Sequence, residues 1–158
     1  FRSSTLLAKF QQLLSARREI SLGFMPQDYH KKLQLDLSPV AYLSHTGQKE
    51  ELQKIQSHLA SLNFSYLEMH HQIRSLSGGQ QGKLLLLDLV LHKPNFLLLD
   101  EPTRNFSPTS QPEIRKLFAS YPGGLITVSH DRRFLKEVCT SIYRLTENGL
   151  EVVDLQDL

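Results

Sequence analysis

The sequence LSGGQQGKLLLLDLVLHKPNFLLLDEPT occupies residues 76–103 and decides the fold of this chain. It combines a glycine turn, an apolar run, a short apolar strand and, at the end of that strand, the adjacent acids Asp100 and Glu101. Two acids side by side at the end of a buried strand cost free energy, because a buried charge loses its hydration. We expect such a pair where a metal ion is bound and a water molecule is activated.

Helix and strand patterns alternate along the rest of the chain. The length of the apolar run at 84–91 predicts a buried helix that begins at the preceding glycines, and 96–99 predicts a fully buried parallel strand. Further helices are predicted over 5–14, 48–62, 66–73 and 113–118 and after Asp131, further strands over 20–24 and 125–128, and a hairpin around Asn148-Gly149 on the margin of the sheet. Thr46 or Gly47 is expected to cap the second of these helices, and Asp131 or Ser129 the last. This order predicts an α/β fold with a mainly parallel sheet.

Composition sets limits on the function. The 158 residues, 40% of them hydrophobic, can bury the core of one domain or of one domain with a small lobe. A net charge of +2 is too small to indicate a dedicated nucleic-acid surface, so no direct DNA binding is expected. The apolar runs fall far short of the roughly 18 residues of a membrane span, so we expect a soluble, cytoplasmic protein without membrane insertion. The single cysteine, Cys139, fits a reducing compartment or a buried small residue.

Polar residues follow three of the predicted strands. Gln27 follows the first, Asp100 and Glu101 end the second, and His130 follows the third. Open α/β sheets bind ligands at the carboxyl ends of their strands, so these residues predict one shared site. The glycine turn adds bare backbone N–H groups and the positive end of a helix dipole, which suit a phosphate.

Four motifs carry a family resemblance. LSGGQ, FLLLDEPT, TVSHD and the upstream MPQ resemble the signature, Walker B, H-loop and Q-loop of ATP-binding cassette (ABC) ATPases, in the order and spacing of that family. SHDRRFL and MPQDY resemble most closely the F-type, soluble ABC proteins. The resemblance implies a partial P-loop NTPase core of the RecA-like type, formed by residues 1–27 and 92–158. It also implies an inserted α-helical lobe over residues 28–91.

The resemblance implies roles for the strand-end residues, with ATP and Mg²⁺ as the ligands. Asp100 would hold the Mg²⁺ shell and Glu101 would act as the general base for the attacking water. Gln27 would contact both the metal and the water, and His130 would touch the γ-phosphate and stabilise its charge.

The glycine turn takes a different part in this family. Ser77, Gly78, Gly79 and Gln80 match the signature loop, which contacts the ATP held by a second cassette. The resemblance therefore implies a head-to-tail pair of cassettes as the functional partner arrangement.

Three positions depart from the family pattern. Of the phosphate loop, only residues 4–7 match, and Ser3 stands where the lysine is expected. The resemblance implies that Ser4 is a metal ligand and that Thr5 contacts the nucleotide. Ser107 stands at the D-loop aspartate, and Lys83 stands at an interface position where the family often has arginine. Because the missing loop supplies most of the phosphate contacts, we expect the chain to be cut from a longer cassette, to bind nucleotide weakly and to turn over essentially none.

The resemblance leaves several functions open. The parent protein would hydrolyse ATP and, like other F-type proteins, act on the ribosome in translation or in relief from antibiotics. An ATPase subunit of a membrane transporter and a non-catalytic module that completes a partner's ATP site are the alternatives. A serine hydrolase built on Ser129-His130-Asp131 is the weakest, because consecutive residues cannot normally face one another as a triad.

Overall fold

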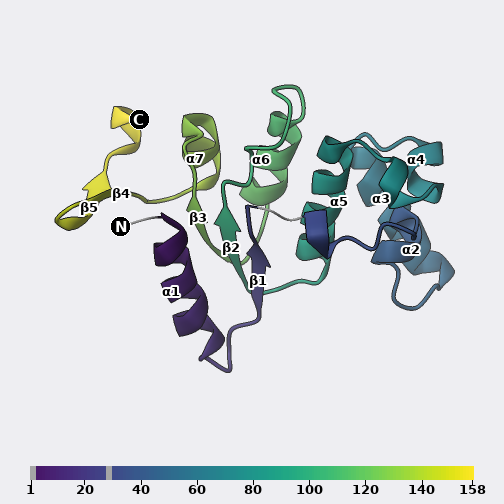
Figure 1. Cartoon of the computed structure of the whole chain (residues 1–158), viewed down its shortest axis with the longest axis horizontal. Helices are drawn as coiled ribbons and strands as arrows, with labels where there is room; N and C mark the ends of the chain where they lie inside the picture. Colours follow the sequence, from purple (N-terminus) through teal and green to yellow (C-terminus); the bar gives the residue numbers. More distant parts are fainter. Residues whose placement is uncertain (1–2, 28–29) are drawn as a thin grey trace. The chain divides into compact units, whose positions relative to one another are not determined.

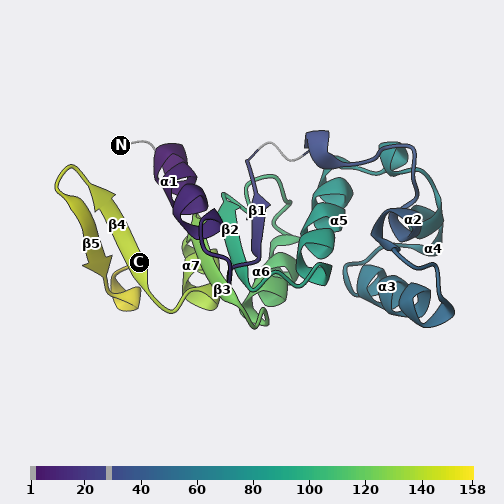
Figure 2. The same ribbon diagram turned by 90° about the horizontal axis from the view of Figure 1, so that it is seen from below.

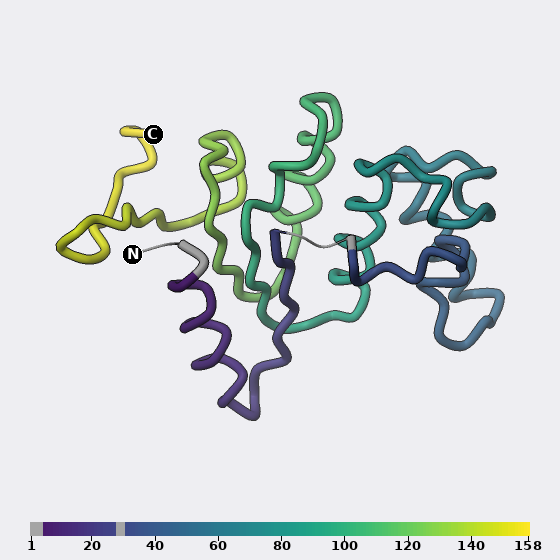
Figure 3. Tube along the Cα trace, viewed as in Figure 1, coloured from purple at the N-terminus to yellow at the C-terminus, as the bar shows by residue number. Residues whose placement is uncertain are grey.

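The computed structural model describes residues 3–27 and 30–158, which divide into two compact units. The first unit comprises residues 1–27, 94–104 and 108–158, and the second comprises residues 28–93 and 105–107. Figure 3 traces the chain as it leaves the first unit after its first strand and returns just before its second.

The first unit is built on a parallel sheet of three strands. These are β1 (Leu22–Met25), β2 (Phe96–Asp100) and β3 (Gly124–Val128), in the spatial order β1-β2-β3. In the register, Met25 pairs with Leu99 and Asp100 pairs with Val128, so the three strands end at the same edge. Leu97, Leu98 and Leu99 are completely buried, as expected for the central strand of a sheet covered on both faces. The predicted α/β fold with a parallel sheet is confirmed.

Helices cover both faces of this sheet. Helix α1 (Ser3–Ser15) lies on one face, and α6 (Gln111–Ala119) and α7 (Arg132–Val138) lie on the other (Figures 1 and 2). The last two helices are joined by an edge-to-face contact of the Phe118 and Phe134 rings, whose centroids are 6.0 Å apart. An ion pair of 2.7 Å between Arg115 Nε and Glu137 Oε2 adds a second link.

The amino ends of the strands are fixed by Asn95 and by two glycines. The Asn95 side chain accepts a hydrogen bond from Ser21 N–H and donates one to the Glu19 carbonyl, which ties the start of β1 to that of β2. At Gly124, a Cβ atom would lie 2.4 Å from the Phe96 ring, so the start of β3 needs a residue without a side chain. Gly123 is equally crowded, because a Cβ there would lie 2.6 Å from the Asn95 carbonyl oxygen.

The predicted hairpin forms, but it does not join the three-stranded sheet. Strands β4 (Ile142–Thr146) and β5 (Gly149–Val153) pair only with each other, in an antiparallel register. The turn residues are Glu147 and Asn148, and Gly149 opens β5 with a φ of +121°. A short 3₁₀ turn, Leu155–Asp157, follows.

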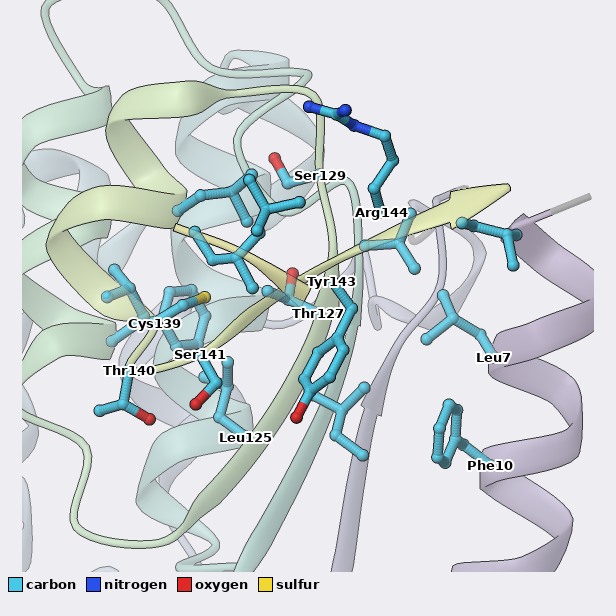
Figure 4. A pocket seen from close by; sticks show the side chains of 18 of the residues that line it. Leu7, Phe10, Leu125, Thr127, Ser129, Cys139, Thr140, Ser141, Tyr143 and Arg144 are labelled. Atoms are coloured by element: carbon cyan, nitrogen blue, oxygen red, sulfur yellow. The ribbon is translucent and has the colours of Figure 1, made fainter. Parts of the chain in front are cut away.

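A cleft of about 1160 Å³ is lined by residues of α1, β3 and the hairpin. Figure 4 shows Leu7 and Phe10 from α1, Leu125 and Thr127 from β3, and Tyr143 from β4 around it. Residues of both β3 and β4 line the cleft, and the hairpin forms a sheet separate from β1-β2-β3.

Cys139 also borders this cleft, at the C-terminal cap of α7. Its side chain is partly buried, and burial raises the pKa of the thiol. A thiol of raised pKa is a weak nucleophile, which agrees with the interpretation of Cys139 as a packing residue.

The second unit is helical. It contains α2 (Pro39–Leu43), α3 (Lys49–Ser61), α4 (Tyr66–His70) and α5 (Gly78–Leu91), with 3₁₀ turns at His30–Lys32 and Ile73–Ser75. Helix α2 is missing from the sequence-based prediction, because five residues are too few to show a helical period. Ser38 starts this helix by accepting a hydrogen bond from Ala41 N–H, and proline follows at the first helical position.

The predicted cap of α3 at Thr46 or Gly47 is wrong. Gln48 is the N-cap residue, and its side chain makes no capping hydrogen bond. Glu51, in the first turn, instead accepts hydrogen bonds from the backbone N–H groups of His45, Thr46 and Gly47, each at 3.0 Å, and from the hydroxyls of Ser44 and Thr46. These donors lower the pKa of Glu51 to about 2.

Across residues 3–27 and 30–158, no helix is both long enough and apolar enough to span a membrane.

Candidate functional site

The carboxyl edge of the parallel sheet gathers the polar residues that follow its strands. Gln27 lies two residues beyond β1 and is exposed, Asp100 is the last residue of β2, and His130 lies two residues beyond β3. The parallel register alone brings these positions to one edge.

Glu101 and His130 are in direct contact at this edge. The backbone N–H of His130 donates to Glu101 Oε2 at 3.3 Å, and His130 Nε2 lies 3.5 Å from Glu101 Oε1. The Glu101 side chain is only 13% exposed, whereas that of His130 is 94% exposed. Each oxygen of the Glu101 carboxylate thus lies near a nitrogen of His130, and the imidazole of that residue is exposed to solvent.

The backbone of Glu101 is held in an unusual conformation. Its φ is +48°, in the left-handed region that residues with a Cβ seldom adopt. The Glu101 N–H donates to the Val128 carbonyl at 2.8 Å, and the Glu101 carbonyl accepts from Arg104 N–H at 3.1 Å. Such strain persists only where the surrounding structure fixes the chain, and it is common at functional sites.

Asp100 supplies a second carboxylate beside Glu101. Burial raises the pKa of Asp100, and the nearby positive charge of Arg104 opposes that rise. Hard oxygen ligands of this kind fit Mg²⁺, which usually takes one or two protein carboxylates together with phosphate oxygens and water. No cluster of three or more His, Cys, Asp or Glu that could hold a metal exists among the described residues.

A hydrogen bond between the loops after β2 and β3 lies next to this pair. Thr103, which is 3% exposed, donates through its hydroxyl to Asp131 Oδ2 at 2.9 Å. Asp131 Oδ1 accepts from Phe134 N–H at 3.1 Å and so caps α7, and the Asp131 N–H donates to Ser129 Oγ. The sequence predicts this cap. It does not predict the Thr103–Asp131 hydrogen bond, because the two residues are 28 positions apart and no local pattern joins them.

This arrangement also bears on the serine hydrolase alternative. The Asp131 carboxylate is engaged by Thr103 and by the start of α7, and Ser129 Oγ accepts from the Asp131 backbone. None of these contacts aligns a serine with a base and the base with an acid, so the geometry is not that of a triad.

The phosphate-loop candidates lie at the start of α1. This helix begins at Ser3, so Ser4 and Thr5 lie in its first turn, and Thr5 is exposed. The side chain of Ser4, like residues 28 and 29 of the MPQDY motif, lies outside the described residues.

The glycine turn of the second unit forms the start of α5. Ser77 is the N-cap residue, and its Oγ accepts from Gln80 N–H at 3.2 Å. Ser77 and Gly78 are exposed, and Gln80 is partly buried. A Cβ at Gly79 would meet only Ser77 Oγ, at 3.9 Å, so packing inside the unit does not require a glycine there. The open backbone at this helix start can instead receive an anion.

The other two departures from the family pattern lie at Lys83 and Ser107. Lys83 is 5% exposed, and its Nζ donates to the Leu62 carbonyl at 3.3 Å. The Lys83 side chain thus packs inside the second unit, and its place at an interface with another cassette stays a prediction. Ser107, at the expected D-loop aspartate, is exposed.

Comparison with known proteins agrees with these motifs. The family model described as "ABC transporter" matches residues 4–104. The probable ATP-binding protein YheS of Escherichia coli K12 is 29% identical over 94% of this chain, and YbiT of Escherichia coli O157:H7 is 33% identical over 79%. ATP-binding cassette sub-family F member 3 of Pongo abelii is 27% identical over 94%. The chain spans 21% to 24% of the length of these relatives.

Solved structures share the fold. A dimeric bacterial ABC transporter cassette superposes with a TM-score of 0.70 at 18% identity, over 91% of this chain and 67% of that one. A dimeric cassette in a post-hydrolysis state, bound to ADP and phosphate, gives a TM-score of 0.69 at the same identity, over 94% and 67% of the two chains. The fold, the four motifs and the match over residues 4–104 together show that this chain belongs to the ABC transporter family, as an ATP-binding cassette domain.

Proposed function

We propose that the intact protein hydrolyses ATP and that Glu101 is its general base. The observation that carries this proposal is the contact of Glu101 with His130 at the edge where Asp100 also lies. Glu101 Oε accepts a proton from water, the water oxygen bonds to the γ-phosphorus, and the bond from that phosphorus to the ADP oxygen breaks. His130 holds the Glu101 carboxylate through its backbone N–H and stabilises charge on the γ-phosphate through its imidazole.

We assign Mg²⁺ binding to Asp100, Gln27 and Ser4, together with the nucleotide's own phosphates. The Mg²⁺ ion would neutralise charge that develops on the β- and γ-oxygens. Gln27 is also the last residue before the chain passes into the second unit, which suits a residue that reports nucleotide binding to that unit. In this proposal the first unit is the RecA-like core and the helical unit is the lobe that carries the signature.

A second cassette completes the ATP site in this proposal. The open N-terminus of α5, with Ser77 and Gly79, suits the γ-phosphate of a nucleotide bound to a partner. Two of the similar solved cassettes are described as dimeric, which supports a paired arrangement.

We further propose that the protein is of the F type, acts in the cytoplasm and has the ribosome as its target. The similarity to a sub-family F member over 94% of the chain supports the first part. The cytoplasmic location and the ribosomal target rest on the resemblance of SHDRRFL and MPQDY to that class.

The 158-residue chain by itself should bind nucleotide weakly. Of the phosphate loop, these 158 residues contain only the match at residues 4–7, so the chain alone offers few of the backbone N–H groups that this loop donates to the phosphates. Titration of the chain with MgATP should give a dissociation constant above about 100 μM without phosphate release, while the intact protein releases phosphate. Micromolar affinity and turnover by the chain alone would contradict this part, and an inactive intact protein would contradict the proposed ATPase.

A non-catalytic module is the second candidate, and the open turn at Gly79 favours it. In that case the chain would supply only Ser77 to Gln80 to a complete cassette. Mixing the two and measuring association by analytical ultracentrifugation should show a complex that forms only with ATP. A Gly79→Val chain is the matched control and should not associate, because its side chain would fill the turn. Absence of association of the unaltered chain would count against this candidate.

A further inference from the structure

A closed ring of hydrogen bonds links the two loops that carry Glu101 and His130. On one side, Glu101 N–H donates to the Val128 carbonyl and His130 N–H donates to the Glu101 carboxylate. On the other side, the Thr103 hydroxyl donates to Asp131 Oδ2. Thr103 is two residues after Glu101, and Asp131 directly follows His130. The Thr103–Asp131 hydrogen bond therefore joins the same two loops as the bonds between Glu101 and residues 128 and 130.

The Thr103–Asp131 bond is the better shielded of the two links. Thr103 is 3% exposed, whereas the His130 side chain is 94% exposed and so gains little support from packing. A hydrogen bond from a buried hydroxyl to a carboxylate is stronger than a bond between neutral groups. The position of His130 therefore depends on the backbone around it, which Asp131 fixes.

Both oxygens of Asp131 are in use. Oδ1 accepts from Phe134 N–H at the start of α7, and Oδ2 accepts from Thr103. The carboxylate thus connects the loop after β2 to the first turn of α7, and it does so immediately beside His130. An asparagine would offer one acceptor oxygen to these two donors.

We propose that Thr103 and Asp131 are positioning residues: their hydrogen bond sets the distance between the Glu101 carboxylate and His130 and supports the left-handed backbone of Glu101. This inference rests on the proposed function of Glu101 and His130 and adds two residues to it. Thr103 and Asp131 touch neither water nor nucleotide in this role and act through the pair that does.

The test uses the intact protein with four single variants. Thr103→Val removes the hydroxyl at nearly constant volume, Thr103→Ser keeps it, and Asp131→Asn removes one acceptor. Thr140→Val is the matched control, because Thr140 is an exposed threonine of the same unit and lies outside the proposed site. Steady-state ATP hydrolysis gives kcat and KM, and a thermal melt reports the folded fraction.

Thr103→Val and Asp131→Asn should each lower kcat per folded molecule about 10-fold or more, with KM changed less than about 3-fold. Thr103→Ser should recover most of kcat, and Thr140→Val should leave it unchanged. The double variant should be no slower than the slower single variant, because both changes break the same bond. A Thr103→Val protein that melts earlier but keeps the kcat of the unaltered protein would overturn the inference and leave a purely structural role.

A spectroscopic readout separates this inference from the proposed function. The imidazole signals of His130 in the 158-residue chain should shift on Thr103→Val and stay in place on Thr140→Val, whether or not ATP is hydrolysed. Inactivity of the unaltered intact protein would contradict the proposed function alone. Unshifted His130 signals in Thr103→Val would overturn the positioning role.

Discussion

At the scale of single residues, the described chain uses its carboxylates in two different ways. Asp100 and Glu101 lie at the end of a buried strand, and burial raises the pKa of Asp100. Glu51 is surrounded by backbone N–H groups and hydroxyls that lower its pKa to about 2. The environment of Asp100 destabilises its negative charge and so favours a bound cation, whereas that of Glu51 satisfies the charge internally and serves stability.

Replacement of Asp100 by asparagine should weaken the Mg²⁺ dependence of the intact ATPase. The change removes one negative charge beside the expected metal and leaves the size of the side chain unchanged. The Mg²⁺ concentration for half-maximal phosphate release should rise about 10-fold or more. The same titration on Asp88→Asn, which alters an acid of the second unit, should give the midpoint of the unaltered protein. An unchanged midpoint in Asp100→Asn would contradict the assignment of Asp100 to the metal.

The Glu51→Gln variant should lose stability in a pH-dependent manner. The pKa of Glu51 falls from an ordinary 4.5 to about 2 on folding, so its contribution is fully present above pH 4.5 and disappears as the pH falls toward 2. Urea unfolding should show a deficit of the variant at pH 7 that shrinks between pH 4.5 and pH 2. Glu50→Gln, which changes the exposed neighbour, is the control and should show a smaller deficit. A Glu51→Gln deficit that is constant with pH would contradict the proposed origin in charge.

At the scale of elements, two glycines at the ends of secondary-structure elements differ in how closely they are packed. Gly124 lies against the Phe96 ring, whereas a Cβ at Gly79, at the start of α5, would meet only Ser77 Oγ at an ordinary van der Waals distance of 3.9 Å. Packing therefore requires a glycine at position 124 but not at position 79, where our proposal places the phosphate of a partner's nucleotide.

Two alanine substitutions should therefore behave in opposite ways. Gly124→Ala should lower the free energy of unfolding by about 1–3 kcal/mol, because the new methyl group overlaps the Phe96 ring. Gly79→Ala should leave it unchanged or raise it by up to about 1 kcal/mol, since alanine favours a helix more than glycine does. Chemical denaturation measures both changes. A loss of more than about 1 kcal/mol in Gly79→Ala would show that this glycine has a structural role.

The elements that the sequence predicted well are those with a strong local signal. The apolar run of 96–99 and the β-branched run of 125–128 became β2 and β3, and the glycine turn began α5 as expected. The expectation that the residues after parallel strands share one edge of the sheet also placed Glu101 and His130 together, and the structure shows them in contact.

The remaining features depend on contacts that local patterns do not show. Helix α2 is too short to show a helical periodicity in its sequence. The start of α3 is stabilised by the Glu51 carboxylate, which accepts hydrogen bonds from the preceding loop. The Thr103–Asp131 bond joins residues 28 positions apart, and local patterns do not show that the hairpin forms a sheet separate from β3. These features could not be predicted from the sequence, because they depend on contacts that form only in the folded chain.

At the scale of the whole molecule, the chain consists of two units with different proposed tasks. The first holds the carboxylates at the edge of its sheet, and the second presents an open helix start. In our proposal each unit contacts a different nucleotide, which is why a pair of cassettes is needed for turnover.

The most direct test of the central claim is phosphate release by the intact protein with and without the Glu101 carboxylate. Glu101→Gln keeps the size of the side chain but cannot take a proton from water, so single-turnover release from MgATP should slow by about 10²–10⁴-fold. ATP binding should be retained, and the paired state should accumulate because its ATP is not consumed. Release by Glu101→Gln at the rate of the unaltered protein would contradict the role of Glu101 as general base.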